Sequence, residues 1–204
     1  PALQKAREQA KSTICLSQLK QIGLASSMYM DDNKESFCGF YLNTDRKQDE
    51  RWVARLLQYT ASAMPFVCPP APQANHPNSI YLRKKTWDEV KTGLSRCMGI
   101  GINGYGQGGT LYTSADIYRA FLYSTQKSST LKKPTSLIYA GDTTGVYYAD
   151  APYTPELSSN NQVLYMFFTP SIYPSQGLSL RPYHGGGTGI NLLMADGHAG
   201  GFRK

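Results

Sequence analysis

Hydrophobic residues recur with helical spacing through the first thirty residues of the chain. Leu3, Ala6, Ala10 and Ile14 lie three or four residues apart, and the same spacing continues through Cys15, Leu19, Ile22, Ser26 and Tyr29. Pro1 suits the first turn of a helix, where a missing N–H costs nothing. The pattern predicts one helix over residues 1–30, with Asn33 as its C-terminal cap.

The two halves of this predicted helix differ in composition. Residues 4–13 are mostly polar or charged, and only a thin apolar stripe of Leu3, Ala6 and Ala10 runs through them. That stripe is too narrow to hold the segment against a core, whereas the second half has a broader apolar face. We therefore expect the first half to project and the second half to dock on a sheet.

The middle of the chain mixes short helical and loop signals. A second helix is predicted over about residues 49–60, with Trp52, Val53, Leu56 and Leu57 on one face. Residues 64–72 contain four Pro, which predicts an ordered surface loop, because Pro disfavours both helix interiors and central strands.

Strand signals gather toward the C-terminus. Apolar runs over residues 136–140 and 162–168 predict strands, the first with a partner at residues 146–148. Residues 189–195 and 198–202 flank Asp196 and Gly197, a turn pair typical of a β-hairpin. The order predicts an α+β fold, a long N-terminal helix packed on an antiparallel β-sheet with loop-rich insertions. The helix takes residues 1–33, and residues 34–204 form the globular head with a hairpin around 189–202.

Composition restricts the class of protein. The 204 residues are 41% hydrophobic with nineteen Gly and twelve Pro, which suits one loop-rich domain. The net charge is +7, but the Lys and Arg are scattered, so we expect no nucleic-acid partner. The sequence has no run of about eighteen apolar residues that would predict a membrane span. The chain starts at Pro1 without Met, which indicates a processed or trimmed product.

Four cysteines stand far apart, at Cys15, Cys38, Cys68 and Cys97. No C-x-x-C pair is present, which argues against a zinc knuckle. The even number suits two disulfides in an oxidising compartment, in any of three connectivities, and four buried thiols are the alternative.

Two glycine-rich motifs invite a catalytic or nucleotide-binding interpretation. Residues 99–104 fit G-x-G-x-x-G, but more Gly follows where a helix should begin, so a flexible turn is the better interpretation. Residues 184–187, His-Gly-Gly-Gly, resemble an esterase oxyanion loop, but no G-x-S-x-G pentapeptide supplies the nucleophile.

The histidines raise the question of a metal. His76, His184 and His198 could join Asp142 and Asp196, yet neither H-x-x-x-H nor H-E-x-x-H occurs. A cation between Asp196 and His198 stays open, while hydrogen bonds of His184 and Asp196 within loops are the simpler expectation. We assign no catalytic, cofactor-binding or metal-binding residue, and no cofactor.

Both ends of the chain carry a family pattern. Residues 2–33 contain Lys-Ala-Arg-Glu, Cys-Leu-Ser and the run Leu-Lys-Gln-Ile-Gly-Leu-Ala before Met-Tyr and Asp-Asp-Asn. Residues 66–69 read Phe-Val-Cys-Pro, and the end combines His184 and its three Gly with Ala-Asp-Gly-His at 195–198. The chain thereby resembles bacterial pilin-like proteins with a prepilin-type cleavage and methylation signal, the type IV pilins and type II secretion pseudopilins.

The resemblance implies a structural subunit of a filament and no enzyme. In that family a hydrophobic helix precedes such a segment, anchors the precursor in the inner membrane, and is cleaved and methylated by prepilin peptidase. On this view Pro1 lies near the junction with a removed membrane-spanning segment. The partners are other pilin or pseudopilin subunits, and the head is extracytoplasmic. The resemblance also places Cys15 opposite Cys68, which leaves Cys38 for Cys97.

Two other functions remain open from the residues. An exported module that recognises a glycan or another substrate could use a cleft lined by Tyr105, Tyr112 or Tyr173. An esterase or metal hydrolase could use His184 and Asp196, and would need a nucleophile beside them.

Overall fold

The structure is a computed structural model that describes residues 2–39, 52–70, 100–103, 127–131, 133–142, 167–168 and 184–203. Its helices and strands are α1 (Ala2–Asp32), α2 (Trp52–Leu56), β1 (Ile100–Asn103), β2 (Ile138–Asp142), β3 (Phe167–Phe168), β4 (Gly189–Met194) and β5 (Ala199–Arg203). Short 3₁₀ turns occupy Leu57–Tyr59, Met64–Phe66, Ser128–Thr130 and Pro134–Ser136.

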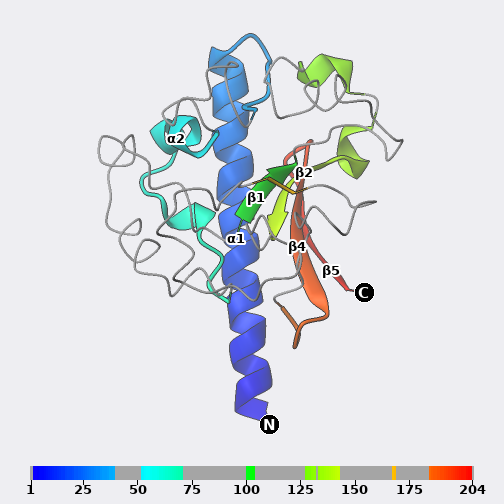
Figure 1. Ribbon diagram of the computed structural model, residues 1–204. Helices are drawn as coiled ribbons and strands as arrows, with labels where there is room; N and C mark the ends of the chain where they lie inside the picture. The colour runs from blue at the N-terminus through cyan, green and yellow to red at the C-terminus, as the bar shows by residue number, and fades with distance from the viewer. Residues whose placement is uncertain are drawn as a thin grey trace, which may run out of the picture.

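The strands form one sheet in the order β3-β1-β2-β4-β5. The pairs β1/β2, β2/β4 and β4/β5 are antiparallel, and β3 lies parallel to β1 at the edge. The long helix α1 packs against β4 and β5 and runs past the strands toward its N-terminus (Figure 1). The predicted α+β class, a long helix on a largely antiparallel sheet, is confirmed.

Helix α1 has the predicted length and the predicted cap. The Asn33 side-chain amide donates to the carbonyl of Tyr29 at 2.8 Å, which satisfies one of the last carbonyls of the helix. Lys34 and Glu35 then take left-handed φ values of 54° and 62°, and the Glu35 N–H donates to Met30 O at 2.9 Å. These bonds end the helix and turn the chain back toward the core.

The buried face of α1 begins at Cys15. It continues through Gln18, Leu19, Ile22, Gly23, Ala25, Ser26 and Tyr29. None of the residues 2–14 is buried, and Leu3 is 70% exposed. Ile14, which the spacing assigned to the apolar face, is 49% exposed, because the buried face of the helix begins only at Cys15.

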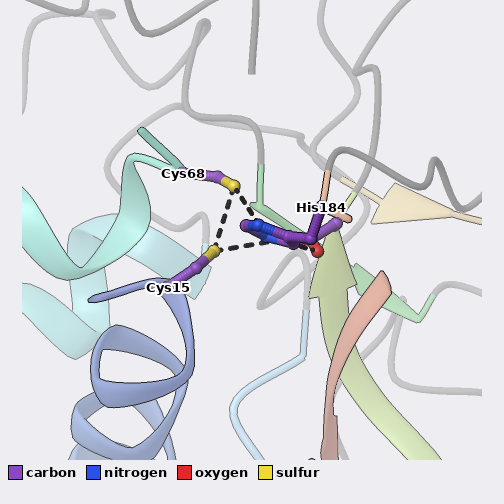
Figure 2. A group of neighbouring side chains, drawn as sticks. Cys15, Cys68 and His184 are labelled. Carbon is purple, nitrogen blue, oxygen red and sulfur yellow. Dashed lines mark hydrogen bonds and ion pairs between the residues drawn. The ribbon is translucent and has the colours of Figure 1, made fainter. Parts of the chain in front are cut away.

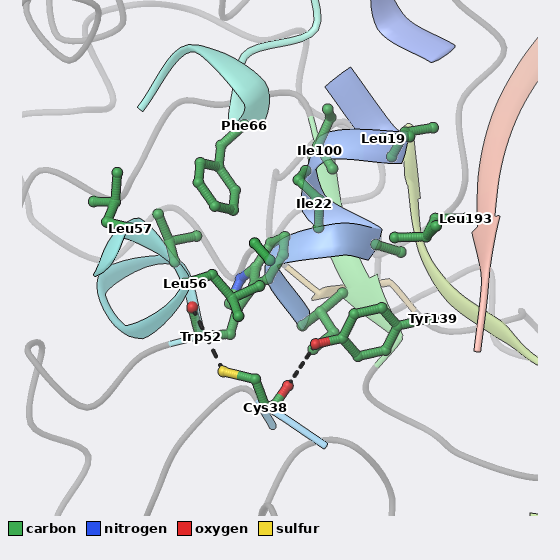
Figure 3. Packing of buried hydrophobic residues seen from close by; sticks show 14 of the residues in the cluster. Leu19, Ile22, Cys38, Trp52, Leu56, Leu57, Phe66, Ile100, Tyr139 and Leu193 are labelled. Carbon is green, nitrogen blue, oxygen red and sulfur yellow. Dashed lines mark hydrogen bonds between the residues drawn. The ribbon is translucent and has the colours of Figure 1, made fainter. Parts of the chain in front are cut away.

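The predicted second helix is present as α2 followed by the turn Leu57–Tyr59, while residues 49–51 are outside the described part. Its four apolar side chains are buried as expected. The ring of Trp52 meets that of Phe66 edge to face, with centroids 5.3 Å apart (Figure 3). Edge-to-face pairs of this kind add to the stability gained by burial.

The surface loop predicted for residues 64–72 is wrong for its first part. Met64–Phe66 form a 3₁₀ turn with Pro65 in its first turn, and Pro65, Phe66, Val67 and Cys68 are all buried. Pro is tolerated at the start of a helical turn, so the proline content did not exclude this structure. The apolar residues between the prolines draw the segment against α1.

The flexible turn predicted for residues 99–104 is also wrong. Residues 100–103 form β1, which lies between β3 and β2, with Ile100 and Ile102 fully buried. Gly101 pairs with Gly141 of β2. Two β-branched residues on alternate positions favour a strand. The glycine between them has no side chain, so the alternation typical of a strand is hard to see in the sequence.

The C-terminal hairpin is confirmed. Leu193 of β4 pairs with Ala199 of β5 across the Asp196–Gly197 turn, and Gly197 has the expected positive φ of 89°. The strand predicted at residues 136–140 is β2, shifted toward Asp142. Of the strand predicted at 162–168 only β3 is described, and its partner predicted at 146–148 lies outside the described residues.

Candidate functional site

Four side chains that can bind metals meet in the interior. They are Cys15 from α1, Cys68 from the segment after the 3₁₀ turn Met64–Phe66, Asp142 from the end of β2, and His184 just before β4. Figure 2 shows Cys15, Cys68 and His184 pointing toward one another. One ligand atom from each lies within 4.8 Å of the other three. Cys15, Cys68 and Asp142 are fully buried, and His184 is 2% exposed. We call these four residues the interior cluster.

The contacts within the interior cluster are short and shared. Cys15 Sγ lies 3.0 Å from Cys68 Sγ and 3.3 Å from Asp142 Oδ1. His184 Nε2 lies 3.2 Å from Asp142 Oδ2 and 3.7 Å from Cys68 Sγ. Among the residues that the structure describes, no second group of three or more His, Cys, Asp or Glu side chains comes so close together.

Two hydrogen bonds from outside hold the interior cluster in place. The backbone N–H of Asn191 on β4 donates to Asp142 Oδ2 at 2.7 Å, which orients the carboxylate toward the sulfur atoms. The Gln18 side chain donates to Met64 O at 2.9 Å, which fastens the segment that carries Cys68 to α1. Neighbouring elements thus fix both the carboxylate and the Cys68 segment.

A tight turn of three glycines places His184. Gly185, Gly186 and Gly187 all have positive φ, at 58°, 71° and 90°, a run that L-residues with side chains avoid. The turn closes when His184 and Gly189 exchange backbone hydrogen bonds of 3.0 and 2.8 Å. The imidazole is thereby carried into the core beside the start of β4.

The same turn gives the His-Gly-Gly-Gly motif a conformational role. The N–H groups of Gly187, Thr188 and Gly189 all donate to the carbonyl of His184, at 3.1, 3.1 and 2.8 Å. These three donors are engaged with the backbone, and their hydrogen bonds close the turn that carries His184.

The surroundings raise the pKa values of two groups in the interior cluster. Burial raises the pKa of the Cys68 thiol, and the hydrogen bond with Cys15 and the charge of Asp142 raise it further. Burial alone would lower the pKa of His184, but hydrogen bonds with Asp142 and Cys15 and their charges outweigh it and raise the pKa to about 9. The protein alone therefore favours neutral Cys68 and a charged imidazole beside Asp142.

The cysteine pairing is corrected in part. The structure brings Cys15 and Cys68 together, as the resemblance implies, but holds them as two thiols 3.0 Å apart, well beyond the ~2.05 Å of a disulfide. Cys38 is also a free, buried thiol, 3.6 Å from the carbonyl of Trp52, so the predicted bridge to Cys97 is absent. Cys97 itself lies outside the described residues.

The expectation that His184 and Asp196 form hydrogen bonds within loops holds for Asp196 but not for the side chain of His184. His184 faces Asp142, whereas Asp196 accepts from its neighbour His198, with Oδ1 2.6 Å from His198 Nδ1. This exposed pair closes the hairpin turn, and no third ligand joins it within the described residues. His76 and the tyrosines Tyr105, Tyr112 and Tyr173 lie outside that part of the chain.

A groove runs between the first half of α1 and the C-terminal hairpin. Lys5, Glu8 and Ser12 line it from the helix, and Phe202 and Arg203 line it from β5. None of the described residues that line it is a tyrosine.

Comparisons with protein-family models, with curated proteins and with solved structures give no match to this chain. Within the described residues, none of the helices combines the length and the apolar character needed to cross a membrane.

Proposed function

We propose that this chain is the head and helix of a structural subunit in a pilin-like filament, of the type IV pilus or the type II secretion pseudopilus. The observation that carries the proposal is the division of α1 at Cys15. Its C-terminal half is buried against the sheet, whereas its N-terminal half has no buried residue and ends in turns that run past the strands (Figure 1). A helix of this form suits a rod that packs with sister rods while the head faces outward.

The exposed side of α1 offers a surface for such packing. Leu3, Ile14, Leu24 and Met28 are between 44% and 70% exposed. Separations of eleven and four residues are close to three turns and one turn of about 3.6 residues, and the separation of ten falls about 80° short of three turns, so the four side chains lie within an arc of about 80° on the helix. That side lies away from the buried face, where the helix of a second subunit could cover it.

The resemblance at both ends of the chain supplies the rest of the proposal. The partners are other subunits through α1, the inner membrane through a segment upstream of Pro1, and prepilin peptidase acting on the precursor. The head belongs outside the cytoplasm. The filament role includes no catalysis and no nucleic acid.

The proposal is tested first by the gene. Upstream of Pro1 we expect about twenty apolar codons after a short basic leader with Gly at the cleavage site. Mass spectrometry of the mature protein from its own cells should then find a methylated new N-terminus. A gene that starts at or near Pro1 would overturn the proposal.

Photo-crosslinking tests the assembly itself. A photoreactive amino acid replaces Leu24 on the exposed side of α1, or Thr135 on the exposed surface of the head as the matched control. In cells that assemble the full-length protein, the probe at Leu24 should give ladders at multiples of the subunit mass, and the probe at Thr135 far fewer. Equal ladders, or none from Leu24, would contradict helix-to-helix packing.

A further inference from the structure

We propose that the interior cluster is a structural zinc site, with Cys15, Cys68, Asp142 and His184 as its four ligands. The first reason is convergence. In a tetrahedral site with metal–sulfur distances of about 2.3 Å and metal–nitrogen or metal–oxygen distances of about 2.0–2.2 Å, ligand atoms stand about 3.3–3.8 Å apart. Separations of 3.0, 3.2, 3.3 and 3.7 Å, in which Asp142 contributes Oδ1 toward Cys15 and Oδ2 toward His184, lie near that range. The two sulfur atoms need to part by less than about 1 Å.

The second reason is that one nitrogen serves the whole group. His184 Nε2 faces both Asp142 and Cys68, whereas Nδ1, fully buried, has no hydrogen-bond partner among the described residues. A catalytic Cys-His-Asp relay uses the two ring nitrogens separately, one for the nucleophile and one for the carboxylate. Here the side chains point at a common centre, as ligands do, and do not form a chain for proton transfer.

The third reason is burial. Three of the four residues are completely inaccessible and the fourth nearly so, which leaves no opening for a substrate among the described residues. Closed four-ligand sites are structural, while catalytic zinc keeps one open position for water or substrate. The site therefore fixes the fold and does not catalyse a reaction.

The ligand types select the metal. Two thiols and an imidazole are soft or intermediate ligands that suit Zn²⁺, and they argue against Mg²⁺ and Ca²⁺, which require oxygen. On binding, each thiol loses its proton to solvent, and the imidazolium of His184 loses the proton on Nε2, so that Nε2 presents its lone pair and the remaining ring proton stays on Nδ1. The two thiolates and the carboxylate then carry three negative charges against the two positive charges of Zn²⁺, so the occupied site has one net negative charge, and no oxidation or reduction is involved.

A disulfide between Cys15 and Cys68 explains the same neighbours less well. The Cys15 thiol lies 3.3 Å from Asp142 Oδ1 and can donate to it, but a disulfide sulfur has no proton to give. A disulfide would also not explain why a carboxylate and a histidine are buried beside it, since burying such a pair is costly. A divalent cation accounts for all four residues at once.

The site would join four segments that are distant in sequence. It ties the first buried turn of α1 to the Cys68 segment, to the end of β2 and to the His184 turn. Cys15 marks the boundary between the exposed and buried halves of α1. The metal would therefore fix the helix to the head at the point where the helix leaves the head.

Metal content and spectroscopy test the proposal on the reduced 204-residue protein. We expect one Zn²⁺ per chain by elemental analysis. With Co²⁺ in place of Zn²⁺, we expect the visible absorption of tetrahedral cobalt and a near-ultraviolet thiolate charge-transfer band. Failure of the folded, reduced protein to take up either metal when supplied in excess would overturn the proposal.

Variants assign the ligands. Cys68→Ser and His184→Gln should each lower the affinity for Zn²⁺ by about 100-fold or more, since even residues that only orient ligands are worth about 10–100-fold. Two control variants should leave the affinity for Zn²⁺ unchanged. Cys38→Ala removes a buried thiol outside the interior cluster, and His198→Gln removes an imidazole in the exposed turn. Ligand variants that bind as tightly as the parent protein would contradict the assignment.

Thiol mapping of the parent protein gives an answer that does not depend on the folding of any variant. The protein is purified without reductant, unfolded in chelator and alkylated, and its peptides are analysed by mass spectrometry. Alkylated Cys15 and Cys68 are expected, because a zinc site releases both thiols. If both remain unmodified until reductant is added, a disulfide occupies this position and the zinc proposal is refuted.

Discussion

Gly23 of α1 lies directly against Leu193 of β4, so closely that a Cβ atom on Gly23 would stand 3.0 Å from Leu193 Cδ1. The same Cβ would stand 3.1 Å from the backbone carbonyl of Gly197 in the hairpin turn. The side chain of Leu193 can move, but the carbonyl belongs to a tight turn. The absence of a side chain at Gly23 therefore sets how closely the helix approaches the sheet.

Replacing Gly23 with Ala should destabilise the protein, although Ala is the better helix former. Helix propensity alone predicts a gain of about 1 kcal/mol, while overpacking a close contact typically costs about 1–3 kcal/mol. We expect the free energy of unfolding to fall by up to about 2 kcal/mol in denaturant titrations, the difference between the two effects. Ser17→Ala, at an exposed position of the same helix, is the control and should change it by less than about 0.5 kcal/mol. A more stable Gly23→Ala variant would show that the contact is looser than described.

Two tyrosine hydroxyl groups near the end of α1 should contribute differently to the stability of the protein. The buried Tyr29 hydroxyl accepts from Arg55 Nη1 at 2.6 Å, while the Tyr59 hydroxyl donates to Asp32 Oδ2 at 2.8 Å in an exposed position. Tyr29→Phe should lower the free energy of unfolding by about 1.5–3 kcal/mol, because it removes a buried bond to a charged group. Tyr59→Phe should cost less than about 1 kcal/mol, because water replaces the lost partner. Thermal or denaturant unfolding of both variants checks the order, and the reverse order would contradict the burial described for the Tyr29 hydroxyl.

Local patterns predicted the parts of the fold that depend on neighbours in sequence. The length of α1, the Asn33 cap and the Asp196–Gly197 hairpin follow from spacing and turn chemistry within a few residues. Residues 64–68 and β1 were mispredicted, because Pro and Gly suggested loops where Phe66 and Ile100 instead drive burial. Pro and Gly permit a turn, but they do not require one when the apolar residues between them can be buried.

The interior cluster could not be assembled from spacing. The resemblance brought Cys15 near Cys68, but Asp142 reaches them only because β2 pairs with β4 and presents its last residue to the Asn191 N–H. His184 enters through a turn that the sequence suggested as a catalytic loop. Contacts between four segments depend on strand order, which single-sequence patterns do not contain.

Cys38 should behave as a free but unreactive thiol. It is fully buried, and burial raises the pKa of its thiol to about 12, although the charge of Arg55 partly opposes this. At pH 8 roughly one molecule in 10⁴ would carry the thiolate, the form that reacts with alkylating reagents. We expect no modification of Cys38 in the native protein and full modification after unfolding without reductant, both read by peptide mass spectrometry. Modification only after reduction would restore the predicted bridge to Cys97.

Asn191 links the sheet to the projecting end of α1, and its amide allows the sharpest test of that link. Its Nδ2 donates to the carbonyl of Ser12 at 3.2 Å and approaches Ser12 Oγ at 3.4 Å. Asn191→Ala should lower the free energy of unfolding by about 1–2 kcal/mol, whereas Ser12→Ala, which removes only the longer contacts, should cost less than about 0.5 kcal/mol.

Asn191→Asp separates the hydrogen bond from the packing, because the two side chains have the same shape. The substitution turns the donor into an oxygen that faces the carbonyl of Ser12, in a position that is 1% exposed. Burial disfavours the charged carboxylate and raises its pKa above the ~3.9 of an unfolded chain. The variant should therefore be less stable than Asn191→Ala at pH 7, and the difference should shrink as the pH falls toward ~4 and the carboxyl takes up its proton in both states. Denaturant titrations at the two pH values measure this difference. A loss that is equal at both would show that the side chain at position 191 faces water and not the helix.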